Sequence, residues 1–68
     1  MDAKKLKIGM KVKFSDGNIV QVTGIGSIDR YGECFFSGIL IRTNQESYKE
    51  YLNKDMRDTW NSAFCQPV

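Results

Sequence analysis

The chain has 68 residues, of which 41% are apolar and 26% are charged, and its formal net charge is +2. This length allows one small domain, and the composition is typical of a globular protein and excludes a chain that is disordered throughout. No apolar run approaches the roughly 18 residues that a membrane-spanning helix needs, and no apolar signal core follows Met1. We therefore expect a single cytoplasmic domain over residues 1–68.

The first predicted strand is basic on one side. Apolar residues occupy every second position from Leu6 to Phe14, and lysines occupy positions 5, 7, 11 and 13. This period of two predicts a strand with one buried face and one solvated face. We expect a loose lead-in at residues 1–5. Gly9 predicts a bend or bulge, so the regular strand is expected from about Met10 to Phe14, with Leu6 and Ile8 packed on the body before it.

A three-residue hairpin loop is predicted at Ser15–Gly17. It pairs Val12 with Val20, whereas a two-residue loop would place Lys13 opposite Val20 and mix apolar with charged partners. The longer loop also places Gly17 third, where a type I turn with a bulge needs a left-handed residue. Glycine adopts that conformation without steric cost.

Two further strands complete a predicted β-meander over residues 6–42. The second runs from Ile19 to about Ile28, and the glycines inside it predict a bend or bulge. Asp29–Gly32 has the composition of a turn. The third strand, at about 33–42, has apolar residues at consecutive positions, which predicts a central strand covered on both sides or one that curls as in a barrel.

A helix is predicted at residues 45–57. Asn44 can cap it, acidic residues fall early and basic residues fall late, which suits the helix dipole. Its apolar stripe comprises Tyr48, Tyr51, Leu52 and Met56. For residues 58–68 we expect a turn and tail, in which a break near Asp58 brings Trp60 and Phe64 inward and residues 65–68 extend against the sheet.

The predicted fold is a β-rich α+β domain: a bent three-stranded antiparallel sheet, SH3-like and partly open as a barrel, with a C-terminal helix. The stretch from Ile8 to Phe14 with Gly17, followed by the strand bent at Gly24 and Gly26, resembles small SH3-like barrels of the KOW type over about the first 40 residues. The resemblance implies binding of nucleic acid or protein segments. Such barrels place further short strands where this chain has its glycine-free stretch.

The sequence predicts no enzyme. Because the chain has no histidine, Ser-His-Asp and Cys-His arrangements and a histidine-containing zinc site are excluded. Cys34 and Cys65 belong to no Cys-x-x-Cys pair, so we expect two reduced thiols, although a disulfide between them stays open. No cofactor or metal is predicted.

Two binding surfaces are candidates. The basic first strand, with an exposed aromatic at the second turn, could follow a phosphate backbone and stack on a base. This set comprises Lys5, Lys7, Lys11, Lys13 and Tyr31. The alternative interpretation is that lysines on an edge strand only prevent aggregation.

The other candidate is a protein interface, because aromatic residues and methionine are enriched at interfaces. Tyr48, Tyr51 and Trp60 are its candidate residues, and the alternative is that they simply fill the core. We expect a small non-catalytic binding module, with a protein partner or a homo-oligomer favoured over nucleic acid.

Overall fold

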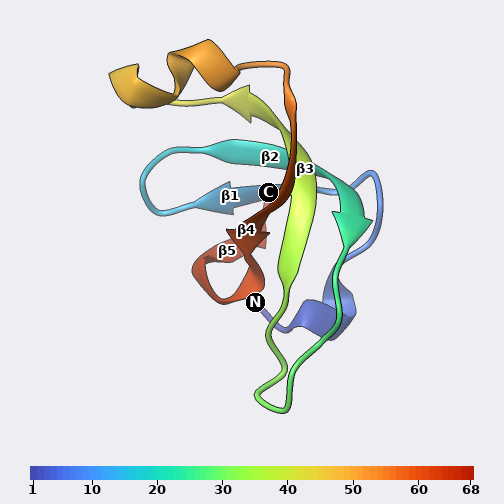
Figure 1. Ribbon diagram of the computed structural model, residues 1–68. Helices are drawn as coiled ribbons and strands as arrows, with labels where there is room; N and C mark the ends of the chain where they lie inside the picture. The colour runs from blue at the N-terminus through green and yellow to red at the C-terminus, as the bar shows by residue number, and fades with distance from the viewer.

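Five β-strands form one antiparallel sheet in the order β4-β3-β2-β1-β5 (Figure 1) in a computed structural model that describes residues 1–68. The strands are β1 (Lys11–Phe14), β2 (Ile19–Ile25), β3 (Phe35–Arg42), β4 (Asp55–Asn61) and β5 (Cys65–Pro67). Three short 3₁₀ helices accompany them: η1 (Ala3–Lys5), η2 (Glu46–Tyr51) and η3 (Ser62–Phe64). None of these helical segments has the length and apolar character to cross a membrane.

The hairpin between β1 and β2 has the predicted register. Val12 lies opposite Val20, and the backbone N–H of Gly17 donates to the carbonyl of Phe14 at 3.0 Å. Gly17 has a φ of +96°, so the predicted left-handed conformation is confirmed. A Cβ at this position would overlap the side-chain amide of Asn44, which packs on the turn.

The β2–β3 connection also follows the sequence pattern. A register shift between Val22 and Gly24 confirms the predicted bulge. At the Asp29–Gly32 turn the N–H of Gly32 donates to the carbonyl of Asp29 at 3.1 Å. The β3 strand lies between β2 and β4, as expected for a central strand.

The predicted helix at residues 45–57 is wrong, and with it the three-stranded α+β fold. Only η2 forms there, and the chain then turns at Asn53, with a φ of +64°, into β4. In β4, Met56 lies opposite Gly38 and Trp60 opposite Phe36. Both side chains pack against the core although β4 is bulged between them: Trp60 follows Met56 by four positions, whereas the paired Gly38 follows Phe36 by two, and Asp58 in the bulge has a φ of +50°. Pairing with β3 supplies backbone partners, whereas η2 buries none of its residues.

The chain termini are tied to the sheet. Residues 3–5 form η1 rather than a loose lead-in, and Ala3 is buried. The Met1 ammonium donates to the carbonyls of Ser62 at 2.8 Å and Cys65 at 2.9 Å. The predicted extended tail is confirmed as β5, which pairs with β1.

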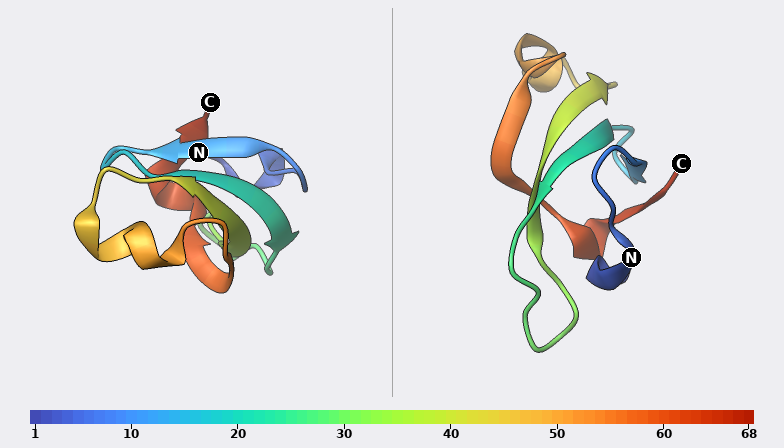
Figure 2. Two further views of the ribbon diagram at one scale, coloured as in Figure 1. Left: turned by 90° about the horizontal axis from the view of Figure 1, so that it is seen from above. Right: turned by 90° about the vertical axis from the view of Figure 1, so that its right-hand side faces the viewer.

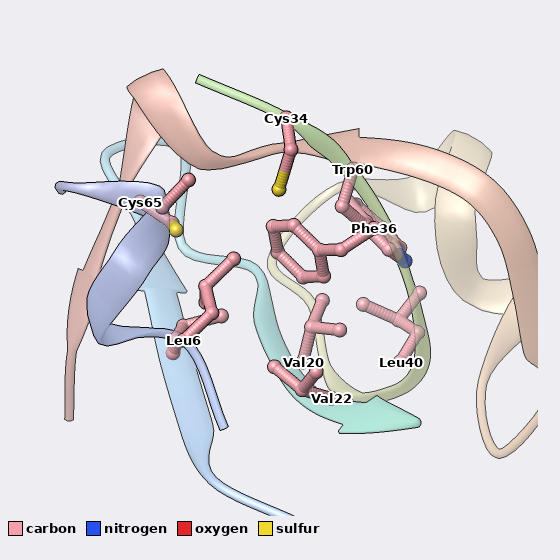
Figure 3. Close-up of a cluster of buried hydrophobic side chains, with 10 residues drawn as sticks. Leu6, Val20, Val22, Cys34, Phe36, Leu40, Trp60 and Cys65 are labelled. Carbon is pink, nitrogen blue, oxygen red and sulfur yellow. The ribbon is translucent and has the colours of Figure 1, made fainter. Parts of the chain in front are cut away.

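The core lies on the concave face of the curled sheet (Figure 3). Alternate residues of the central strands point into it, and η1 with its following residue covers one side. The buried hydrophobic residues are Ala3, Leu6, Val12, Val20, Val22, Cys34, Phe36, Leu40, Trp60 and Cys65.

Candidate functional site

A groove lined by aromatic side chains is the largest concavity of the molecule, with a volume of about 710 Å³. It lies at the end of the sheet where η2 and the β1–β2 turn project on the same side (Figure 1). Six of the eight aromatic residues of the chain line it. The complete lining of this aromatic groove is Phe14, Ser15, Asp16, Asn18, Phe35, Tyr48, Tyr51, Met56, Thr59, Trp60, Asn61 and Phe64.

Trp60 forms a fixed floor. Only 6% of the residue is exposed, and its ring centroid lies 5.4 Å from that of Phe14. Phe14 in turn stacks on Phe36 at 6.4 Å, with the planes 17° apart. The indole Nε1 donates to the carbonyl of Gly38 at 3.4 Å. The floor is thus held by the core beneath it and by a polar anchor at one edge.

The walls of the groove are open to solvent. Tyr48 and Tyr51 on η2 meet edge to face at 6.4 Å and are 36% and 37% exposed. Phe35 is 57% exposed and Phe64 is 70% exposed. A gathering of exposed aromatic side chains around a concavity is typical of binding surfaces.

One end of the groove is polar. Asp16 is the only charged residue in the lining, and its Oδ1 accepts the backbone N–H of Asn18 at 3.1 Å. Asn18 is only 1% exposed, and its Oδ1 is buried without a hydrogen-bond donor. A buried acceptor without a partner costs about 1–3 kcal/mol. At this end the exposed Asp16 carboxylate therefore offers an acceptor to a ligand, and no cation lines the groove.

The three residues of the predicted protein interface meet in this groove. Tyr48 and Tyr51 form one wall, and Trp60, expected to be open, is buried as the floor. Phe64 was expected to point inward but is mostly exposed at the rim.

The sequence interpretation missed Phe14, Phe35, Met56 and Asp16 as groove residues. A signal existed for Phe35, because adjacent phenylalanines in one strand point to opposite faces and only one of them can enter the core.

The predicted basic row is not continuous. Lys11 and Lys13 are exposed on β1, but a turn closed by the N–H of Met10 and the carbonyl of Lys7, 3.2 Å apart, separates Lys7 from that strand. Lys5 belongs to η1. Since β1 pairs with both β2 and β5, it is not an edge strand, and the edge-protection interpretation is wrong.

Tyr31 lies away from the lysines of β1. It is 73% exposed, and the guanidinium of Arg30 lies 5.1 Å from its ring centroid. The β2–β3 loop that carries it extends from the end of the sheet opposite η2 (Figure 2). There it lines a separate hollow with Lys4 and the acidic residues Asp2 and Glu33.

Both cysteines are free and buried, and their thiols point into the core (Figure 3). Burial raises the pKa of the Cys65 thiol, and the neighbouring Cys34 raises it further, although the Met1 ammonium acts against both. Burial and the raised pKa both keep the Cys65 thiol protonated, which is its less nucleophilic form. No three His, Cys, Asp or Glu side chains gather as a metal site would require.

Comparison of the chain with protein-family models, with curated proteins and with solved structures finds no match. The function is therefore inferred from the geometry and chemistry of the groove.

Proposed function

We propose that the protein is a small non-catalytic binding module whose aromatic groove takes up an extended segment of a protein partner. The observation that carries this proposal is the convergence of six aromatic side chains on one concavity, four of them at least one-third exposed. Tyr and Trp in a pocket are the side chains that contribute most to protein interfaces, because they bury a large area at a low cost in conformational entropy.

The charge of the groove favours a protein segment over a nucleic acid. Its lining contains one carboxylate and neither lysine nor arginine. A phosphate backbone is bound through lysine and arginine, so phosphates would find no cation here and would be repelled by Asp16.

The resemblance of about the first 40 residues to SH3-like barrels does not separate the two candidates, because it implies binding of either protein segments or nucleic acid.

Nucleic-acid binding through β1 is the second candidate. Lys11 and Lys13 project from an internal strand and form no ion pair, so neither edge protection nor a salt bridge accounts for them. The surface is smaller than the sequence pattern predicts, because Lys5, Lys7 and Tyr31 lie elsewhere.

The first candidate is tested by selecting binders from a random peptide library displayed on phage and measuring their affinities by calorimetry. We expect the double variant Tyr48→Ala/Tyr51→Ala to lose at least about tenfold in affinity, as truncation of interface aromatics does. Tyr31→Ala is the matched control, because Tyr31 is exposed but lies outside the groove. Equal losses in both variants, or no selectable binder, would contradict the proposal.

The second candidate is tested with a mixed pool of DNA and RNA in a retardation assay at several salt concentrations. Binding through the lysines should fall steeply with salt and with Lys11→Glu/Lys13→Glu. Lys54→Glu, which changes an exposed lysine outside β1, is the control. The absence of retardation at low salt removes this candidate.

A further inference from the structure

The aromatic groove has an uncompensated acidic end. The only ion pair of the structure joins Lys49 to Glu46, at 2.9 Å, so the Asp16 carboxylate has no cationic partner. Its oxygens meet only the backbone N–H of Asn18 at 3.1 Å and the Nδ2 of the same residue at 3.5 Å. Asp58, also without a cation, lines a smaller hollow that shares Phe35 with the groove. Asp16 is therefore the only charged side chain of the groove itself, and Lys13 lines another hollow that shares three residues with the groove, namely Phe14, Ser15 and Phe64.

Hydrogen bonding at the same end also favours a donor. Asn18 lies in the groove wall, and its Oδ1 is buried with no donor. The amide orientation follows from its neighbour, since the Nδ2 group faces the Asp16 carboxylate and the opposite orientation would set two oxygens against each other. Because Oδ1 is covered in the free protein, the acceptor at this end that a ligand donor can reach directly is the Asp16 carboxylate.

The aromatic walls add an attraction for positive charge. The faces of Tyr and Trp rings attract a nearby cation electrostatically, and the effect grows when the cation is partly desolvated in a concave site. Tyr48 and Tyr51 meet edge to face, with their planes 79° apart, and both line the groove. The molecule already shows such a contact elsewhere, between Arg30 and Tyr31.

We infer that the segment bound in the aromatic groove carries an arginine flanked by apolar residues. Its guanidinium pairs with Asp16 and stacks on the tyrosine wall, while the apolar neighbours cover Trp60 and the phenylalanines. Arginine fits better than lysine because the planar guanidinium group can bind a carboxylate through two hydrogen bonds. Its weakly hydrated face also stacks on aromatic rings. This inference rests on the proposed function, since it names the chemistry of the partner at the same groove.

The test uses acetylated and amidated nonapeptides without tryptophan, in which a central arginine stands in varied contexts of Leu, Pro, Val, Met and Tyr. Each sequence is also made with citrulline, lysine or glutamate at the centre. Citrulline keeps the shape of arginine and removes its charge. Dissociation constants are measured from the fluorescence of Trp60, the only tryptophan of the chain and the floor of the groove.

We expect arginine peptides to bind about tenfold more tightly than the citrulline peptides of the same sequence. This is the combined effect of one guanidinium–carboxylate ion pair and one cation–π contact. Asp16→Asn should remove most of this difference and leave the affinity for citrulline peptides unchanged. Asp29→Asn is the matched control, because Asp29 also accepts backbone N–H groups in a turn but lies outside the groove.

The outcomes separate the inference from the function on which it rests. Equal affinity for arginine and citrulline peptides, or tighter binding of glutamate peptides, contradicts the inference that the bound segment carries an arginine. The groove would still be a peptide-binding site. Failure of all four peptide series to bind overturns the proposed function itself. Displacement of bound peptide by a DNA and RNA pool, or a dimer in sedimentation velocity that excludes the peptides, assigns the groove to another occupant and overturns both.

Discussion

The indole ring of Trp60 lies 5.4 Å from the phenyl ring of Phe14, with the two planes 39° apart. These residues belong to β4 and β1, which are separated in the sheet by β3 and β2. They meet because the sheet curls and brings its inner face onto itself. The groove floor is thus a product of that curvature, and a change in either ring acts on both the core and the site.

Truncation of the floor should therefore destabilise the fold. Trp60→Ala removes a buried aromatic side chain, and such changes lower the free energy of unfolding by about 3–5 kcal/mol. Urea denaturation followed by circular dichroism measures the change. Phe64→Ala, at the solvent-exposed rim, should stay within about 0.5 kcal/mol of the parent protein. Similar losses in the two variants would show that Trp60 isn't the support inferred here.

Gly17→Ala should destabilise more than Gly9→Ala. Both glycines have a positive φ, +96° and +91°, and a left-handed L-residue costs about 1–2 kcal/mol. A Cβ at Gly9 meets nothing within 4 Å, whereas one at Gly17 overlaps the Asn44 side chain.

A second substitution isolates that overlap. Introducing Asn44→Ala into the Gly17→Ala variant should restore the part of the stability that is lost through the overlap with Asn44. Only the cost of the left-handed backbone at position 17 should then remain. Denaturation midpoints of the single and double variants form the required cycle, and an additive result would mean that the turn accommodates the methyl group by moving.

Ser62→Ala should test the hydrogen bonding between η3 and Cys34, the residue before β3. The Ser62 Oγ accepts the backbone N–H of Cys34 at 3.0 Å, in a fully buried position, and the Ser62 N–H donates to the Cys34 carbonyl at 2.9 Å. Loss of the hydroxyl leaves a buried N–H without a partner, at a cost of about 1–3 kcal/mol. Ser37→Ala is the comparison, because Ser37 accepts the N–H of Asp58 at a more exposed place, where water replaces the lost acceptor. A larger loss for Ser37→Ala contradicts this account.

The buried thiol of Cys65 predicts a loss of stability in alkali. Its pKa in the folded protein lies above the ordinary value of 9.0, chiefly because of burial. The unfolded thiol ionises first, so its contribution to stability is complete below about pH 9 and is lost as the pH rises through the folded pKa.

Cys65→Ala, although less stable at neutral pH, should lose less stability between about pH 7 and about pH 10 than the parent protein does. All other ionisable groups are present in both proteins, so the difference between their urea midpoints reports the effect of removing the Cys65 thiol. Identical slopes with pH would show that the Cys65 pKa isn't raised.

Local chemistry made the first half of the fold predictable. The alternation of apolar residues and lysines up to Phe14 and the glycine at position 17 both belong to one hairpin. Together they specify the register of that hairpin. The second half depends on an ambiguity of spacing, because Met56 and Trp60 fit both a helix stripe and one face of a strand. Pairing with β3 decides between the two, and that pairing joins residues about twenty positions apart in the chain.

The candidate site was predictable only through its residue types. Tyr48, Tyr51 and Trp60 are typical interface residues wherever they fall, so composition alone made them candidates. Phe14 and Asp16 join them only because the curled sheet brings the first hairpin beside η2, a relationship that no local pattern encodes.

The lack of buried residues in η2 has a consequence for the range of partners. Its hydrogen bonds to flanking residues are local, such as that from the Tyr48 N–H to the Gln45 carbonyl, so it can shift without breaking the sheet. Amide hydrogen exchange should therefore be faster in η2 than in β2 and β3. We therefore expect this wall to adjust to the segment that it receives, so that the groove tolerates varied apolar neighbours. Ordering the two tyrosines on binding should limit the affinity to a moderate level.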